Sequence, residues 1–273
     1  MNMEEILKVT DLKKVYGKRG AATTALNGVS FSLRGGEYVG IMGASGSGKT
    51  TLLNCVSTID RPTSGSILVD GKELSDLRGK ELARFRRERL GFIFQDCNLL
   101  DTLTAFENIA LALTILGTPA GEIDRRVRDT AGLLGLERVL EKYPYQLSGG
   151  EQQRVAAARA IITAPALVLA DEPTGARDSK SAGQLLGQLS QLNREQGATI
   201  VMVTHDAFTA SWCHRILFIK DGRVFHQIYR GEATSEQLYQ KISDTLTMLQ
   251  GGERVQQVAV LKYEAQPLPA EFR

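Results

Sequence analysis

The sequence predicts an α/β protein whose β-sheet is largely parallel. Short apolar runs that are typical of buried strands alternate with longer stretches that have the pattern of helices. Alternation of this kind favours parallel strands joined by helical crossovers. The strand candidates are ILKV, VSFSL, YVGIMG, SILVD, LGFIF, ALVLA, TIVMVT and RILFIK, and the helix candidates span residues 49–57, 80–88, 151–162 and 182–196.

The chain is long enough for one large domain with a subdomain. It has 273 residues, of which 42% are hydrophobic and 23% charged, so it can bury a sizeable core. A net charge of +2 is too small to favour a nucleic-acid partner, and we expect none. The cysteines, Cys55, Cys97 and Cys213, are scattered, which argues against a disulfide framework or a zinc site and suits a reducing cytosol.

The sequence predicts neither a membrane span nor a signal peptide. No apolar run approaches the roughly 18–20 residues that a span needs, since the longest candidates, 109–116 and 198–203, have the length of core segments. Near the first methionine the chain carries acidic residues where a signal peptide would be basic. We therefore expect an intracellular chain.

Two segments depart from the alternating pattern. The first roughly forty residues have the pattern of β-hairpins punctuated by glycines, which predicts an N-terminal antiparallel β subdomain. Residues 98–145 hold no convincing strand and predict an inserted helical subdomain, and an amphipathic helix over 235–250 is closed by Gly251 and Gly252. We divide the chain into a core of about 1–95 and 160–231, a helical subdomain of about 96–159, and a C-terminal helical extension with a loose tail over 232–273.

The segment GASGSGKT has the pattern GxxxxGK[ST] of a phosphate-binding loop, in the required place between a strand and a helix. Its glycines let backbone N–H groups turn toward phosphate oxygens, and the helix presents its positive dipole end. We expect Lys49 to place its charge between the β- and γ-phosphates and the Thr50 hydroxyl to ligate Mg²⁺. The alternative is an ordinary glycine-rich turn. The nucleotide-binding candidates are Gly43, Ala44, Ser45, Gly46, Ser47, Gly48, Lys49, Thr50 and Thr51.

A second apolar run, ALVLADEP, ends in adjacent carboxylates. Because successive strand residues point to opposite sides, we expect the two acids to take different roles. Asp171 suits Mg²⁺ binding through a water molecule, and Glu172 suits the base that polarises the attacking water. Acids often end strands, so this pattern indicates a site only in combination with the phosphate-binding loop.

Three more polar residues are candidates for the same site. Gln95 follows LGFIF and His205 follows TIVMVT. The carboxyl ends of parallel strands converge where ligands bind, so we expect Gln95 to touch Mg²⁺ and the attacking water, and His205 to touch the γ-phosphate. Taken singly, each would be a strand-end residue satisfied locally. Tyr16, beside Gly17 in an early hairpin, is the candidate for stacking on adenine, with a half-buried strand tyrosine as the alternative.

The stretch LSGGEQQR places two glycines directly before a predicted helix that begins at Glu151. Ser148 offers a hydroxyl, and Gly149 and Gly150 let bare backbone approach a phosphate without a Cβ clash. The dipole of the helix attracts the same negative charge. Ser148, Gly149, Gly150 and Glu151 therefore form a second candidate anion site.

The order of the phosphate-binding loop, Gln95, LSGGE, LVLADE and His205 resembles the ATPase subunit of ATP-binding-cassette (ABC) transporters over about 7–231. The resemblance implies an ABC nucleotide-binding domain over 1–231, with a RecA-like P-loop NTPase core. It also implies a head-to-tail homodimer that holds ATP between the phosphate-binding loop of one copy and LSGGE of the other.

One position departs from the family pattern. Where the family usually has PTGALDS, this chain has PTGARDS, so that Arg177 replaces a leucine and Asp178 is kept. The family pattern places this loop at the seam between the two copies. A cation there would either alter cooperativity or partner choice or be neutral.

Within the family, the sequence resembles the BceA-like ATPases of bacterial antimicrobial-peptide resistance and sensing transporters. This resemblance implies an integral membrane permease of the FtsX/MacB-like class, a bacitracin-like peptide as substrate, and a place at the cytoplasmic face of the membrane. A sensor histidine kinase, reached through the permease, is a further candidate partner. The alternatives are a LolD-like lipoprotein-releasing ATPase, an FtsE-like cell-division ATPase, or a complex that mainly signals. The resemblance is carried by DTLTAFENIALALTI, PYQLSGGEQQRVAAARAI, ADEPTGARDSKSA and RILFIKDGRVFHQIYRGE.

Overall fold

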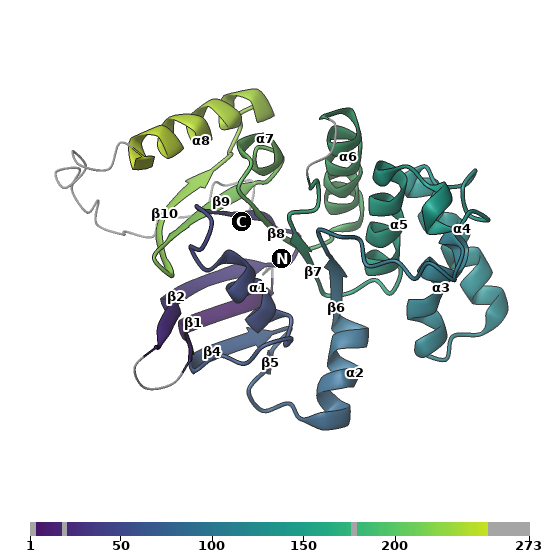
Figure 1. The fold of residues 1–273 in the computed structure, drawn as a ribbon, viewed down its shortest axis with the longest axis horizontal. Coiled ribbons are helices and arrows are strands. Elements are labelled where there is room, and N and C mark those ends of the chain that lie inside the picture. The colour runs from purple at the N-terminus through teal and green to yellow at the C-terminus, as the bar shows by residue number, and fades with distance from the viewer. Residues whose placement is uncertain (1–3, 18–20, 176–178, 251–273) are drawn as a thin grey trace.

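The computed structural model describes residues 4–17, 21–175 and 179–250. Strands and helices alternate along the chain, and the predicted α/β fold class is confirmed (Figure 1). A six-stranded sheet with the order β10-β9-β3-β8-β7-β6 lies at the centre. Its strands are β3 (Tyr38–Met42), β6 (Leu90–Ile93), β7 (Leu167–Asp171), β8 (Ile200–Thr204), β9 (Arg215–Lys220) and β10 (Arg223–Tyr229).

The central sheet is parallel except at one edge, where β10 pairs antiparallel with β9. The strands β3 and β8 are buried along their whole length, and β7 is buried up to its last residue. Strands covered on both faces are apolar throughout, which is why the sequence predicts these three so clearly. The strand β10 was not predicted, because its residues are mostly half-buried or exposed.

A second sheet is antiparallel, with the order β2-β1-β4-β5. The predicted N-terminal hairpin forms from β1 and β2, and β4 pairs with the other edge of β1. The strand β5 was not predicted, because two residues carry no periodic signal. The strands are β1 (Glu5–Tyr16), β2 (Thr23–Arg34), β4 (Ser64–Val69) and β5 (Lys72–Glu73).

The helices surround the central sheet, and α3, α4 and α5 gather on one side of it, away from the antiparallel sheet (Figure 1). Within the described ranges, no helix combines the length and the apolar character that a bilayer crossing requires. The helices are α1 (Lys49–Val56), α2 (Gly79–Arg89), α3 (Ala105–Ile115), α4 (Ala120–Leu134), α5 (Gly149–Ile161), α6 (Ser179–Gln196), α7 (Ala207–Ala210) and α8 (Ser235–Gln250), with a 3₁₀ turn, η1, at Pro144–Gln146.

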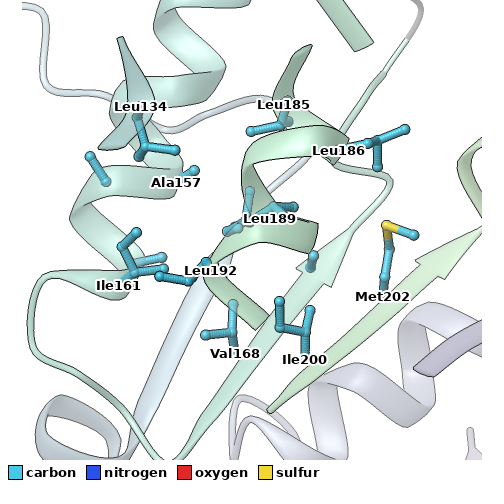
Figure 2. Close-up of a cluster of buried hydrophobic side chains, with 14 of the residues drawn as sticks. Leu134, Ala157, Ile161, Val168, Leu185, Leu186, Leu189, Leu192, Ile200 and Met202 are labelled. Atoms are coloured by element: carbon cyan, nitrogen blue, oxygen red, sulfur yellow. The ribbon is translucent and has the colours of Figure 1, made fainter. Parts of the chain in front are cut away.

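Two hydrophobic clusters cover the two faces of the central sheet. Neighbouring residues of a strand point to opposite faces, so Val168 and Leu169 of β7 belong to different clusters. One face packs against α5 and α6, where the leucines of α6 lie over Val168, Ile200 and Met202 (Figure 2). The other face packs against α1 and the antiparallel sheet. Burial of each such leucine stabilises the folded state by roughly 1.5–3 kcal/mol.

The predicted C-terminal helix is present as α8, which packs on α7. Its Leu238 and Ile242 are fully buried and belong to the same cluster as the residues beneath α6. The glycines that were expected to close this helix, Gly251 and Gly252, and the tail beyond them lie outside the described residues.

Candidate active site

The phosphate-binding loop connects β3 to α1, as the sequence predicts. Gly48 is the N-cap residue of α1, has φ 102°, and provides no side chain to cap the helix. The N–H groups of the first helical turn have no partner within the helix. They are therefore available to an anion, and the helix dipole favours negative charge at this end.

Two glycines of the loop are also required by packing. A Cβ on Gly43 would overlap the carbonyl oxygen of Ile219 and lie 2.6 Å from the Ser47 hydroxyl, and a Cβ on Gly48 would overlap the carbonyl oxygen of Ala25. The loop is thus held against neighbouring backbone. The N–H of Gly222 also donates to Ser47 O, at 3.2 Å.

Lys49 lies inside the curve of this loop. Its ammonium donates to the carbonyl oxygens of Gly43 and Ala44, at 2.8 and 2.9 Å. Burial lowers the pKa of Lys49, while the charges of Glu172 and Asp171 act in the opposite direction. The ammonium is thereby placed where the loop's free N–H groups would receive phosphate.

Asp171 is the last residue of β7 and interacts with Thr50 in the first turn of α1. Burial raises the pKa of Asp171, and the charge of Glu172 adds to this, whereas a hydrogen bond from Thr50 and the charge of Lys49 lower it. Its Oδ1 atom is buried and has no hydrogen-bond partner. An unpaired carboxylate oxygen beside the Thr50 hydroxyl matches the oxygen ligands that Mg²⁺ prefers, so these residues fit the predicted metal.

Glu172 lies just beyond β7 in a left-handed backbone conformation, with φ 46°. Strand alternation was expected to separate the two acids, but this reason is wrong, because β7 ends at Asp171. The turn at Glu172 sets the direction of the Glu172 side chain instead. The N–H of Glu172 donates to Val203 O of the neighbouring strand, at 2.9 Å. Non-glycine residues in this conformation concentrate at functional sites, where the surrounding structure compensates the strain.

Two residues at the end of β8 hold the Glu172 carboxylate. His205 Nδ1 lies 2.7 Å from Oε1, and the Thr204 hydroxyl donates to Oε2 at 3.1 Å. The Thr204 oxygen also accepts from the N–H of Asp206, which leaves its own proton for Glu172. Thr204 was not among the predicted residues, since a threonine at the end of an apolar run carries no distinct signal.

Gln95 is exposed and lies two residues after β6. The loop that carries it forms hydrogen bonds with α5 both before and after Gln95. Gln153, which is 1% exposed, donates to Phe94 O, and Arg159 donates to the carbonyl oxygens of Cys97 and Asn98, at 2.7 and 2.8 Å. Gln153 and Arg159 were not among the predicted residues, because polar residues within a helix are usually solvated.

Tyr16 is the last residue of β1 and is 40% exposed. Its hydroxyl donates to Asp60 Oδ2 at 2.7 Å, and the ammonium of Lys14 lies over its ring, 4.7 Å from the centroid. Asp60 belongs to the loop that follows α1. The candidate for adenine stacking is thus connected to the helix that follows the phosphate-binding loop.

The LSGGE segment differs from the expectation in one respect. The helix α5 begins at Gly149 and not at Glu151. Ser148 is its N-cap: the Ser148 hydroxyl accepts from the N–H of Glu151 at 3.3 Å, and the Glu151 carboxylate accepts from the N–H of Ser148 at 2.7 Å. This reciprocal capping box allows the helix to start two residues earlier. Ser148 and Gly149 are exposed.

A hollow of about 660 Å³ lies beside Glu172 and His205. The start of α6, the short helix α7 and Leu246 of α8 form its other walls. Arg177, which departs from the family pattern, and Asp178, which keeps it, lie outside the described residues.

Comparisons with known proteins point to one family. A family model described as ABC transporter matches residues 26–175. The bacitracin export ATP-binding protein BceA of Halalkalibacterium halodurans is 49% identical over 90% of this chain and 97% of its own length. The lipoprotein-releasing system ATP-binding protein LolD of Geobacter metallireducens is 42% identical over 81% of this chain and 99% of its own length.

Two further relatives concern a permease and a dimer. The macrolide export ATP-binding/permease protein MacB of Wolinella succinogenes is 41% identical over 81% of this chain and 34% of its own length. The dimeric structure of the ATP-binding cassette MJ0796 of Methanocaldococcus jannaschii in a post-hydrolysis state, bound to ADP and phosphate, aligns with a TM-score of 0.76 and 40% identity. It covers 82% of this chain and 98% of the other. The chain therefore belongs to the ABC transporter family, as an ATP-binding subunit with ATPase activity.

Proposed function

We propose that two copies of this chain close head to tail around two ATP molecules, and that hydrolysis and phosphate release let them part. The observation that carries this proposal is the helix tip at Ser148, which is exposed and already capped by its own residues. The tip and the phosphate-binding loop are two anion sites on different elements of one chain. The dimeric structure of MJ0796 with bound ADP and phosphate supports a dimer that forms with nucleotide.

In this proposal, the chain grips the triphosphate with the N–H groups at the start of α1 and with the Lys49 ammonium. Lys49 exchanges its two carbonyl partners for the β- and γ-phosphate oxygens. The exposed tip of the second copy supplies the Ser148 hydroxyl, and bare backbone at Gly149 and Gly150. Tyr16 stacks on the adenine ring.

Glu172 is the proposed base. It accepts the proton of the attacking water, while Thr204 and His205 hold its carboxylate in place. Because an ionised carboxylate only accepts hydrogen bonds, the proton of this contact lies on His205 Nδ1. The other ring nitrogen of His205, Nε2, is the atom that contacts the γ-phosphate in this proposal.

Thr50, Asp171 and Gln95 are the proposed Mg²⁺ residues, with Asp171 acting through a water molecule. The unpaired Oδ1 atom of Asp171 supports this assignment. Mg²⁺ would neutralise charge that develops on the β- and γ-phosphates. Gln95 also contacts the attacking water in this proposal. The loop that carries it is bonded through Phe94 and Cys97 to α5, the helix whose tip closes on ATP.

The closed dimer drives a separate integral membrane permease of the FtsX/MacB-like class, which places the chain at the cytoplasmic face of the membrane. ATP shifts the population toward the closed state because it contacts both copies only there. The similarity to BceA supports a bacitracin-like peptide as the substrate, and that to MacB supports the permease class. A sensor histidine kinase, reached through the permease, is part of the same proposal.

A LolD-like role in lipoprotein release is the second candidate, supported by the match to LolD. The match to BceA covers 90% of this chain against 81% for LolD, which favours the antimicrobial-peptide role. Cells that carry Glu172→Gln distinguish the two. Loss of bacitracin resistance with unchanged lipoprotein release supports the first role, and the reverse supports the second. Kinase activation that persists without peptide removal would support a mainly signalling complex.

Mixing two inactive variants tests the shared site. Lys49→Ala removes the phosphate charge from one loop, and Ser148→Arg blocks one tip. Their heterodimer keeps one intact loop facing one intact tip, so weak ATP hydrolysis returns. The control mixes Lys49→Ala with a chain that carries both substitutions, in which no intact loop remains. Absence of hydrolysis in a heterodimer shown to form by two-tag purification would overturn the sandwich.

A further inference from the structure

Tyr16 is held by Lys14 and Asp60, two residues outside the predicted site. The Tyr16 hydroxyl donates to Asp60 Oδ2 at 2.7 Å, and the Lys14 ammonium donates to Asp60 Oδ1 at 2.6 Å. The same ammonium donates to Arg61 O at 2.7 Å and lies 4.7 Å from the centroid of the Tyr16 ring. One carboxylate therefore binds both the phenol and the cation that covers its ring.

The burial of this cluster differs from that of ordinary surface pairs. The side chain of Lys14 is 12% exposed and that of Asp60 is 29% exposed, whereas the neighbouring pair of Lys13 and Asp11 is 46% and 65% exposed. Partly buried pairs are screened less by solvent than exposed ones. Desolvation lowers the pKa of Lys14, but its hydrogen bond to Asp60 and the charge of Asp60 outweigh it and raise the pKa. The cation over the ring is thus stabilised.

The cluster also connects Tyr16 to the phosphate-binding loop. Asp60 lies four residues beyond the end of α1, and its N–H donates to Asn54 O in that helix, at 3.0 Å. The same helix begins at Lys49. The position of the ring is therefore set relative to α1, whose first turn belongs to the phosphate site, and not by the hairpin alone.

The chemistry of the ring suits a planar partner on the face that Lys14 leaves open. The ammonium is attracted to the electron-rich face of the phenol and polarises it. With its hydroxyl bonded and one face covered, the ring has little rotational freedom left to lose when a base stacks on it. A platform that is already ordered costs less to use than one that must be ordered by the ligand.

We propose that Lys14 and Asp60 are positioning residues that fix the Tyr16 ring as the platform for the base of the bound nucleotide, at a set place relative to α1. This inference rests on the proposed role of Tyr16. It assigns to the two residues a share of nucleotide affinity that depends on the base and not on the phosphates. Neither residue touches the nucleotide in this proposal.

The test compares ATP with inorganic triphosphate, which lacks a base, as ligands of the full chain. Glu172→Gln serves as the background, so that binding is measured without hydrolysis. We expect Lys14→Met and Asp60→Ala each to raise the Kd for ATP about threefold to tenfold, the range for one lost hydrogen bond. The Kd for triphosphate stays within about twofold. The matched controls, Lys13→Met and Asp11→Ala, leave both values unchanged.

Variants of Tyr16 distinguish the stacking role of Tyr16 from the positioning role of Lys14 and Asp60. Tyr16→Ala should weaken ATP binding at least about fivefold, as expected for a lost stacking partner. Tyr16→Phe combined with Asp60→Ala should cost no more than the larger single effect, because both remove the same contact. If Tyr16→Ala leaves ATP affinity unchanged, the proposed role of Tyr16 is wrong. If it weakens binding while Lys14→Met and Asp60→Ala do not, only the present inference is wrong. Equal losses for ATP and triphosphate would show a general disturbance of the fold and overturn the inference too.

Discussion

Glu172 and His205 contact each other across the ends of two neighbouring strands, with 2.7 Å between the carboxylate Oε1 and the imidazole Nδ1. Glu172 follows β7 and His205 follows β8. The contact forms because β7 and β8 pair in parallel, so that their carboxyl ends lie side by side. The left-handed backbone at Glu172 then turns its side chain toward β8.

Replacement of Glu172 by glutamine should stop turnover without preventing ATP binding. An amide keeps the size of the side chain but accepts no proton, so we expect ATP hydrolysis to fall about 10²–10⁴-fold. The closed dimer then persists, and size-exclusion chromatography with ATP should show it. Glu195→Gln, an exposed change on α6, is the control. A monomer in the presence of ATP, or hydrolysis at the parent rate, would contradict the prediction.

Arg159 should control catalysis from a distance through the loop of Gln95. Arg159→Met removes the guanidinium that donates to the carbonyl oxygens of Cys97 and Asn98, which costs about 1–3 kcal/mol. Because the loop carries Gln95, we expect kcat for ATP hydrolysis to fall more than KM rises. Steady-state kinetics measure the two constants. Arg128→Met removes an exposed ion pair on α4 and should change neither, since such pairs contribute little. Equal kinetics of the Arg159 and Arg128 variants would refute this role.

The phosphate-binding loop should not accept a methyl group at Gly43. The Cβ of Gly43→Ala would overlap Ile219 O and displace the loop, which we expect to cost about 1–3 kcal/mol of stability. The midpoint of thermal unfolding should fall, and ATP binding should become weaker. Gly183→Ala is the matched control, because its Cβ meets open space within α6. Alanine there should be neutral or stabilise the helix by up to about 1 kcal/mol.

Stability should fall in mild acid because of His214. Burial lowers the pKa of His214 from its ordinary value of 6.5, and the charge of Arg230 adds to this. Below about pH 6.5 the unfolded chain therefore binds a proton that the folded chain resists, and stability is lost as the pH falls toward the lower folded pKa.

Thermal unfolding at about pH 7.5 and about pH 5.5 measures this loss, since the two values bracket the titration of an ordinary histidine. The midpoint of the parent protein should drop more than that of His214→Gln. His226→Gln, a change at an exposed residue of β10, should behave like the parent. An equal drop in the unfolding midpoint of the parent and of His214→Gln would contradict the role of His214.

Much of the fold could be predicted because local patterns carry it. The strands that hold the site, β3, β7 and β8, are covered on both faces and so are continuous apolar runs. The glycine and lysine pattern of the phosphate-binding loop could be located for the same reason, since its chemistry is contained in eight consecutive residues. The division into domains and the roles of the site residues stay predictions.

The errors also have local causes. The start of α5 was placed two residues late because glycine has a low helix propensity, while the capping box between Ser148 and Glu151 overcomes that cost. The strand β10 lies at the edge of the sheet, where half-exposed residues weaken the apolar pattern.

The sequence alone determines the α/β class, the phosphate-binding loop and the family, because each of these can be recognised from short runs of residues and their order. The residues that contact those motifs from elsewhere in the chain were set only by the tertiary structure. Asp60 meets Tyr16 from 44 positions away, and Arg159 meets the loop of Gln95 from about 60. Such contacts join polar residues that have no pattern of their own, and they exist only because packing of strands and helices brings distant segments together.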